Sequence, residues 1–265
     1  MKSIAILAMS ALSAFAGSEV KYQAGDVTAH GYLALPEGAS TENKVPGVVV
    51  IHEWWGHNDY ARKRADMVAE LGYAALAIDM YGKGKTTTHP KDAGSFAKEA
   101  TSNNEVMKER FLAGMNFLQA QEQVDESKTI AMGYCMGGRI ALQMAVMNTP
   151  NLLGAASFHG ALNVEVPEEV TIIKPKLLVC NGADDTFISQ ETIAEFKKAI
   201  VEHKGEMVFI NFPDAVHGFT NPKATELGKK NNLNLAYNEE ADEESWATFV
   251  DFAARVFAGE DIEPQ

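Results

Sequence analysis

The chain has 265 residues, a length that suits one α/β domain or two small ones. Hydrophobic residues make up 46% of it and charged residues 22%, the usual balance of a globular protein. The formal net charge of −13 argues against a nucleic-acid partner, because proteins that bind nucleic acids present basic surfaces.

The N-terminal residues have the pattern of a secretory signal peptide. Lys2 precedes an apolar stretch over residues 4–12, and Ala14 and Ala16 form a small-x-small cleavage site. We expect cleavage after Ala16, export to the periplasm or the medium, and one mature domain over residues 17–265. The alternative is an uncleaved N-terminal helix. No later segment approaches roughly 18 consecutive apolar residues, so we expect no membrane association.

Short apolar or β-branched runs then alternate with longer helical patterns. The runs predict strands at 19–23, 28–35, 47–52, 73–79, 128–134, 154–159, 176–181 and 207–212. The longer patterns predict helices at 59–71, 104–121, 136–147, 190–203 and 243–257. This alternation indicates an α/β fold with a mostly parallel sheet of about eight strands and helices on both faces. The first two strands alternate more strongly, which favours an antiparallel edge. Residues 81–95 form the longest irregular stretch.

The stretch VVVIHEWWGHNDY, residues 48–60, raises the question of a zinc site. Zinc proteases place two histidines four residues apart on one helix, with a glutamate between them. His52 and His57 are five residues apart, which on a helix would turn the second about 140° from the first. The apolar run before His52 predicts a strand, and Gly56 disfavours a helix. We therefore expect no metal and no cofactor, with both histidines as structural loop residues.

Residues 129–138, TIAMGYCMGG, have the pattern of a nucleophile elbow with a cysteine in the nucleophile position. Such an elbow is a sharp strand-to-helix turn. Gly133 and Gly137 lack the Cβ atoms that would crowd the neighbouring strand and helix, and Gly138 lets the backbone pack closer still. Cys135 would lie at the N-terminus of the following helix, where the dipole favours thiolate over thiol. The alternative is a glycine-rich turn with an inert cysteine.

An elbow nucleophile requires an acid and then a histidine later in the chain. Asp185 lies three residues after Gly182, where a predicted strand ends, and this spacing selects Asp185 over Asp184. His217 follows the next predicted strand and is the candidate base. His159 ends a neighbouring strand, and we expect a structural role for it.

The two cysteines, Cys135 and Cys180, are not expected to form a disulfide. The strand at 154–159 should lie between the strands that carry them. Two inter-strand steps are about 9.6 Å, which exceeds the Cα separation of about 7 Å that a disulfide tolerates. Cys180 is therefore interpreted as a buried packing residue and Cys135 as a free thiol.

The segments GYCMGG, GADDTF, HGF and HEWWG together resemble the motifs of the dienelactone hydrolase family. The resemblance runs from about Val20 to Phe257. It implies an α/β-hydrolase fold, a Cys-His-Asp triad, and a carboxylic ester hydrolase that acts on a small-molecule ester or lactone without a cofactor. The oligomeric state cannot be read from it.

The resemblance also implies individual roles. Cys135 would be the nucleophile, His217 the base and Asp185 the acid that orients it. Glu53 matches a family glutamate that interacts with the resting thiol and helps to form the thiolate. The backbone N–H groups of Trp54 and Met136 match the oxyanion hole.

Two positions depart from the family pattern. Lys83 stands where well-studied members have an arginine that binds a substrate carboxylate, and a lysine binds a carboxylate less specifically than a guanidinium. Asn221 replaces a second arginine that helps to bind this carboxylate and to hold the glutamate. The aromatic residues near the site, Trp54, Trp55, Tyr81 and Phe219, suggest an aromatic pocket, and with Lys83 the last three are the expected substrate contacts.

Two other functions are compatible with a cysteine at an elbow. One is a thiol-dependent redox protein or peroxidase, but the chain has no C-x-x-C motif and no well-placed resolving cysteine. The other is a non-catalytic ligand-binding relative that retains the turn. Ester cleavage by the wild type but not by a Cys135→Ala variant would distinguish a hydrolase from both.

Overall fold

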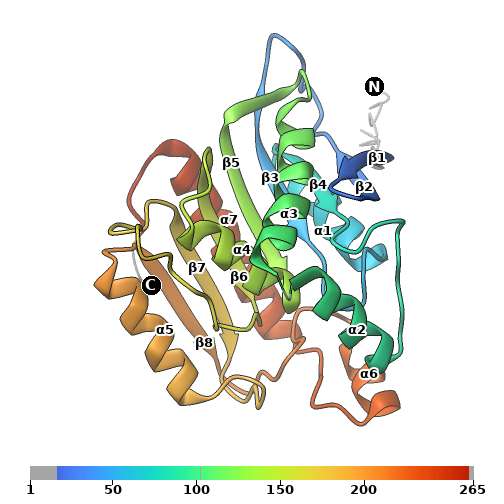
Figure 1. Cartoon of the computed structure of the whole chain (residues 1–265), viewed down its shortest axis with the longest axis vertical. Coiled ribbons are helices and arrows are strands. Elements are labelled where there is room, and N and C mark those ends of the chain that lie inside the picture. Colours follow the sequence, from blue (N-terminus) through green and yellow to red (C-terminus); the bar gives the residue numbers. More distant parts are fainter. Residues whose placement is uncertain (1–16, 102, 263–265) are drawn as a thin grey trace, which may run out of the picture.

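The computed structural model describes residues 17–101 and 103–262. The predicted signal peptide lies outside the described residues. The described part of the chain forms one sheet of eight strands in the order β1-β2-β4-β3-β5-β6-β7-β8 (Figure 1). The strands are β1 (Ser18–Ala24), β2 (Val27–Ala34), β3 (Val45–Ile51), β4 (Ala74–Ile78), β5 (Val124–Tyr134), β6 (Leu152–Phe158), β7 (Lys176–Gly182) and β8 (Met207–Phe212).

The sheet is parallel except at one edge. β1 pairs with β2 and β2 pairs with β4 in antiparallel register, while every pair from β4 through β8 is parallel. Five consecutive residues of β3, Gly47–Ile51, are buried, as expected for a strand that is covered on both faces. The predicted α/β-hydrolase architecture and its antiparallel edge are confirmed.

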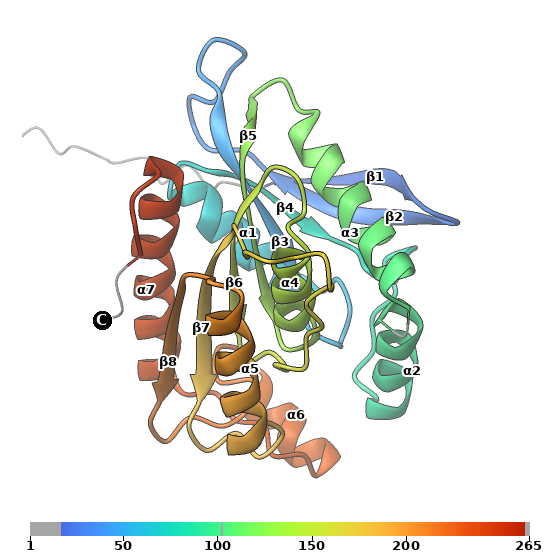
Figure 2. The ribbon, with the colours of Figure 1, turned by 60° about the vertical axis from the view of Figure 1, so that its left-hand side comes forward.

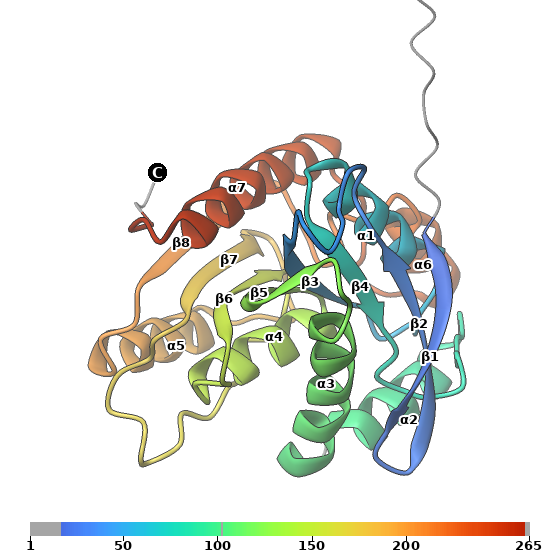
Figure 3. The ribbon, with the colours of Figure 1, turned by 90° about the horizontal axis from the view of Figure 1, so that it is seen from above.

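Helices cover both faces of the sheet (Figure 3). They are α1 (Asp59–Glu70), α2 (Pro90–Thr101), α3 (Asn104–Gln119), α4 (Met136–Val146), α5 (Gln190–Glu202), α6 (Ala224–Asn231) and α7 (Glu239–Ala258). Buried residues of α3, α4 and α5 form one hydrophobic core with the sheet, and those of α1 and α7 form a second core on the other face. Among the described residues, no helix is long and apolar enough to cross a membrane.

Two helices differ from the sequence predictions. The stretch expected to be irregular, residues 81–95, contains the start of α2, and α6 was not expected at all. Helix α6 buries only two residues and has no apolar stripe by which it could be recognised. Helix α2 does have one, because Ala93, Phe96, Ala97 and Ala100 follow the i, i+3, i+4, i+7 spacing and the last three pack on the core, so the prediction of an irregular segment was wrong there. Helix α7 begins at Glu239, four residues before the predicted start, because Asn238 caps it and acidic residues in its first turn complement the helix dipole.

The two cysteines lie as the strand order predicts. β6 separates β5, which leads into Cys135, from β7, which contains Cys180. Both cysteines are free, so the prediction that they form no disulfide is confirmed.

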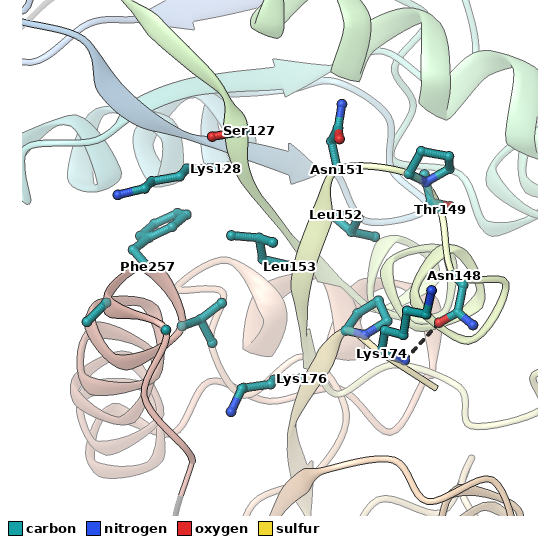
Figure 4. Close-up of a pocket in the computed structure, with 15 residues that line it drawn as sticks. Ser127, Lys128, Asn148, Thr149, Asn151, Leu152, Leu153, Lys174, Lys176 and Phe257 are labelled. Atoms are coloured by element: carbon teal, nitrogen blue, oxygen red, sulfur yellow. Dashed lines mark hydrogen bonds between the residues drawn. The ribbon is translucent and has the colours of Figure 1, made fainter. Parts of the chain in front are cut away.

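A cavity of about 850 Å³ lies at the edge of the sheet where β6 and β7 begin. Figure 4 shows lysines from several segments around it, including Lys128, Lys174 and Lys176, and the ring of Phe257 from the end of α7. Ligands of open α/β sheets bind at the carboxyl ends of the strands. The catalytic candidates all follow the carboxyl ends of strands. This larger cavity lies at the amino ends of β6 and β7, on the opposite side of the sheet from the candidates.

Candidate active site

Cys135 occupies a strained turn between β5 and α4. Its φ of 54° and ψ of −116° lie in a region that residues with a side chain rarely adopt. The glycines permit this geometry: a Cβ atom on Gly133 would overlap the carbonyl oxygen of Gly137, and one on Gly137 would overlap that of Ile51. The half-buried Cys135 lines a cavity of about 520 Å³, within the usual size of a small-ligand site.

Replacement of Gly137 by alanine is expected to destabilise the protein by about 1–3 kcal/mol or more, because the new methyl group meets a backbone oxygen of β3 that cannot move aside. Gly94 is the matched control. It lies inside α2, and nothing in the surrounding structure comes within 4 Å of the position that a methyl group would take, so Gly94→Ala should stabilise by about 0.5–1 kcal/mol. Urea unfolding measures both, and a Gly137→Ala variant as stable as the wild type would contradict this packing of the elbow.

The structure brings His217 and Asp185 together. The Nδ1 atom of His217 lies 2.8 Å from Oδ2 of Asp185, and Oδ1 of Asp185 accepts a hydrogen bond from the N–H of Phe187 at 2.8 Å. β7 and β8 are parallel, so the loops that follow them start from the same edge of the sheet (Figure 2). This contact leaves Nε2 of His217 as the ring atom available to the cavity, which His217 and Cys135 both line.

The charges around His217 favour its protonated form. Burial alone would lower the pKa of His217, but the neighbouring Cys135, as a thiolate, and the Asp185 carboxylate raise it to about 10. A protonated imidazole beside a thiolate is the resting pair of many cysteine hydrolases. At neutral pH the imidazolium form of His217 is therefore favoured.

Glu53 is a buried carboxylate whose one side-chain partner within the described part of the chain is Asn221. The glutamate is 4% exposed, and its Oε2 accepts a hydrogen bond of 2.6 Å from Nδ2 of Asn221. Burial raises the pKa of Glu53 to about 7, although the Asn221 hydrogen bond and the charges of His217 and Arg64 oppose this rise. A carboxylate whose pKa lies near neutrality can exchange a proton under physiological conditions. Asn221 thus holds the glutamate at the position where the family arginine was expected.

Trp54 and Met136, which carry the expected oxyanion donors, both line the cavity of Cys135. Met136 is the first residue of α4, so its N–H has no acceptor within the helix, and neither N–H donates to a described residue. The Tyr81 hydroxyl donates to the Trp54 carbonyl oxygen at 2.9 Å and lies 3.3 Å from the Met136 sulfur. Tyr81 therefore ties together the two segments that carry the candidate oxyanion donors.

His52 takes part in the structure of this loop. Its Nδ1 lies 2.6 Å from the carbonyl oxygen of Glu53, and its Nε2 accepts a hydrogen bond of 3.2 Å from the N–H of Met80. Both ring nitrogens are engaged by backbone groups, and burial lowers the pKa of His52. His52 thus fixes the loop that carries Glu53 and Trp54.

A buried polar network supports the loop of His217 and Asn221. The Arg64 guanidinium pairs with Asp242 and donates to the Thr220 carbonyl oxygen at 2.9 Å. The Thr220 hydroxyl lies 2.8 Å from Nε2 of His159, whose ring packs edge-on against His217 with 5.2 Å between centroids. Burial holds the pKa of His159 well below its usual range, and the His217 charge lowers it further. His159 is therefore a neutral packing partner of His217, which agrees with the structural role expected of it.

The four expected substrate contacts do not line this cavity. Lys83 is exposed at a turn, where its N–H donates to the Thr28 carbonyl oxygen. Tyr81 and Phe219 are buried in the cores, and Trp55 borders a separate cavity of about 460 Å³ next to Asn221. The prediction failed because closeness along the sequence to the active-site loops does not determine the direction in which each side chain points.

Other residues line the cavity instead. They are Trp54, Ala97, Thr101, Cys135, Met136, Arg139, Ala161, Asn163, Phe187, Ile188, His217 and Leu235. Arg139 could have been found from the sequence, because it lies one helical turn after Cys135. Ala97 and Thr101 belong to α2, which was not among the helices predicted from the sequence.

Comparisons with known proteins agree with this architecture. The model of the dienelactone hydrolase family matches residues 29–257. A dienelactone hydrolase-like promiscuous phosphotriesterase from metagenomic libraries is 33% identical, with a TM-score of 0.84 over 91% of this chain and 98% of that one. A protein of Aquifex aeolicus, named as a candidate carboxymethylenebutenolidase, is 25% identical over 89% of this chain and 97% of its own. Protein usf of Aquifex pyrophilus is 26% identical over 80% and 90%, respectively. The chain therefore belongs to the dienelactone hydrolase family.

Proposed function

We propose that the protein hydrolyses small carboxylic esters or lactones by acyl transfer through Cys135. The observation that carries the proposal is the hydrogen bond of 2.8 Å between His217 and the buried Asp185 beside the cavity of Cys135. A base oriented by a buried acid next to a nucleophile on a strained turn is the arrangement that acyl transfer requires.

The first half-reaction forms a thioester. The Cys135 thiolate attacks the carbonyl carbon of the substrate, and the N–H groups of Trp54 and Met136 stabilise the oxyanion. Such donors are each worth about 2.7–4 kcal/mol at the transition state. The oxyanion then collapses and the carbon–oxygen bond to the leaving group breaks. His217 gives its Nε2 proton to the departing alkoxide, so the acyl group remains on sulfur.

The second half-reaction releases the acid. Neutral His217 removes a proton from a water molecule, and the resulting hydroxide adds to the thioester carbonyl carbon. Collapse of this intermediate expels the Cys135 thiolate, with the His217 imidazolium beside it again. Glu53 serves in the resting state: its carboxylate accepts the proton of any Cys135 that is present as thiol, and its pKa of about 7 suits this exchange.

A thiol redox function receives less support from the site. Cys180 is completely buried in β7, and β6 separates that strand from β5 and the elbow. Burial also raises the pKa of the Cys180 thiol, which makes it a poor nucleophile. Cys180 is therefore badly placed to resolve an oxidised Cys135.

Trapping of the acyl enzyme tests the proposal. Rapid acid quenching after mixing with p-nitrophenyl acetate should yield protein that carries one acetyl group, and peptide mass spectrometry should assign this group to Cys135. The matched control is Cys180→Ala, which should be acetylated to the same extent. Ester cleavage with no acetyl group on Cys135 at any quench time would exclude the covalent route.

A further inference from the structure

The cavity of Cys135 contains one permanent charge among the described residues that line it. Arg139 supplies this charge, and the other lining residues are apolar or neutral except for Cys135 and His217. No lining residue is a carboxylate. In a chain with a formal net charge of −13, a cation inside the cavity of Cys135 creates a local attraction for anions next to the candidate nucleophile.

The Arg139 guanidinium is only partly engaged by the protein. Its Nε donates to the carbonyl oxygen of Asn163 at 3.2 Å. None of the ion pairs within residues 17–101 and 103–262 includes Arg139, and no described residue accepts a hydrogen bond from its two Nη groups. The Nε contact fixes the plane of the fork, while the Nη donors remain for a ligand in the cavity.

The position of Arg139 on its helix is unfavourable without a ligand. It lies at the start of α4, where the partial positive charge of the dipole disfavours a cation, and the first turn of α4 has no acidic residue to compensate. Partial burial lowers the pKa of Arg139, and Glu165 opposes this change, but a guanidinium remains protonated in proteins. A bound anion would relieve both unfavourable effects, since it would interact with the guanidinium and the helix terminus together.

We propose that Arg139 determines substrate specificity by binding a carboxylate group carried by the ester or lactone substrate. The inference rests on the proposed function. Arg139 lies four positions after Cys135 along the chain, a helical rise of about 6 Å, so the carboxylate lies a few bonds from the attacked carbonyl. The planar guanidinium can donate two parallel N–H···O bonds to a carboxylate, which fixes its orientation as well as its charge.

Matched ester pairs test the role of Arg139. One pair is mono-p-nitrophenyl glutarate and p-nitrophenyl pentanoate, which differ by a carboxylate on the acyl side. The other is 4-acetoxybenzoate and its methyl ester, which differ on the leaving-group side. The variants are Arg139→Gln and Arg139→Lys, and the control is Lys83→Gln, which removes an exposed cation that does not line the cavity.

Arg139→Gln should lower kcat/KM for the anionic ester of at least one pair by about 10- to 100-fold, with less than a threefold change for its neutral partner. Arg139→Lys should retain part of the activity toward the anionic ester, because lysine keeps the positive charge but lacks the planar guanidinium. Lys83→Gln should leave kcat/KM unchanged for both esters of each pair.

The inference would be overturned if Arg139→Gln caused no selective loss of kcat/KM for the anionic ester in either pair. An equal loss of kcat/KM for charged and neutral esters would also overturn it, because a structural role would produce that result. So would an effect of Lys83→Gln as large as that of Arg139→Gln. Failure of the proposed function would look different, because the wild type would then not hydrolyse the neutral esters through Cys135.

Discussion

Replacement of Cys135 by alanine is expected to lower kcat/KM for p-nitrophenyl acetate by about 10⁴- to 10⁶-fold, the range seen when a catalytic nucleophile is removed. The variant should still fold, because the strained backbone at φ of 54° tolerates alanine no worse than cysteine. The residual rate would reflect the oxyanion donors and His217 alone, since no acyl enzyme can form. Initial rates of p-nitrophenolate release at pH 8, corrected for spontaneous hydrolysis, measure the effect.

Cys180→Ala is the matched control for this experiment. Cys180 is fully buried in β7, so its truncation should cost about 1 kcal/mol of stability through lost packing but leave kcat/KM within about twofold. Equal rates for the wild type and Cys135→Ala would sink the proposed mechanism. Loss of activity in both variants would instead indicate that the assay reports folding rather than chemistry.

Replacement of Glu53 by glutamine is expected to stabilise the protein above neutral pH. Burial raises the folded-state pKa of Glu53 from 4.5 to about 7, so between these values the folded state binds more protons than the unfolded chain. The stability of the wild type therefore falls as pH rises through this window. A pKa difference of this size between the folded and unfolded states corresponds to about 3 kcal/mol of unfolding free energy. Glutamine cannot ionise, so the stability of the variant does not depend on this group. The difference in unfolding free energy between variant and wild type should therefore increase from about pH 4.5 to 7 and stay constant above pH 7.

The same substitution should reduce activity. Because the proposed mechanism uses the Glu53 carboxylate to accept the thiol proton, Glu53→Gln should lower kcat/KM by about 10²-fold. A fall in activity of the wild type below about pH 7 should be absent from the variant. Asp184→Asn is the control, because it removes an exposed carboxylate near the site. Urea unfolding and pH–rate profiles measure the two effects. A stability difference that does not change with pH would show that Glu53 is not a buried acid with a raised pKa.

Local patterns in the chain were sufficient to predict most of the framework. The glycines on either side of Cys135 indicate an elbow, because a sharp strand-to-helix turn with the nucleophile at its centre leaves no room for Cβ atoms at Gly133 and Gly137. The order of cysteine, Asp185 and His217 along the chain predicts that they meet, because parallel strands bring their carboxyl ends to one edge. The same logic correctly separated Cys135 from Cys180, and the apolar run before His52 correctly predicted the strand β3 in place of a helix.

The contacts that distinguish this site depend on side-chain direction in three dimensions, which no periodicity in the chain records. Asn221 and Glu53 are 168 residues apart, and only the packing of two loops makes the amide replace the expected arginine. Lys83 and Tyr81 follow a strand end as predicted, yet one turns to solvent and the other into the core, because the backbone between them reverses at Gly82 with a φ of 78°. The sequence therefore specifies which groups can react, whereas the choice of Arg139 over Lys83 as the cation of the cavity follows from the direction in which the folded backbone points each side chain.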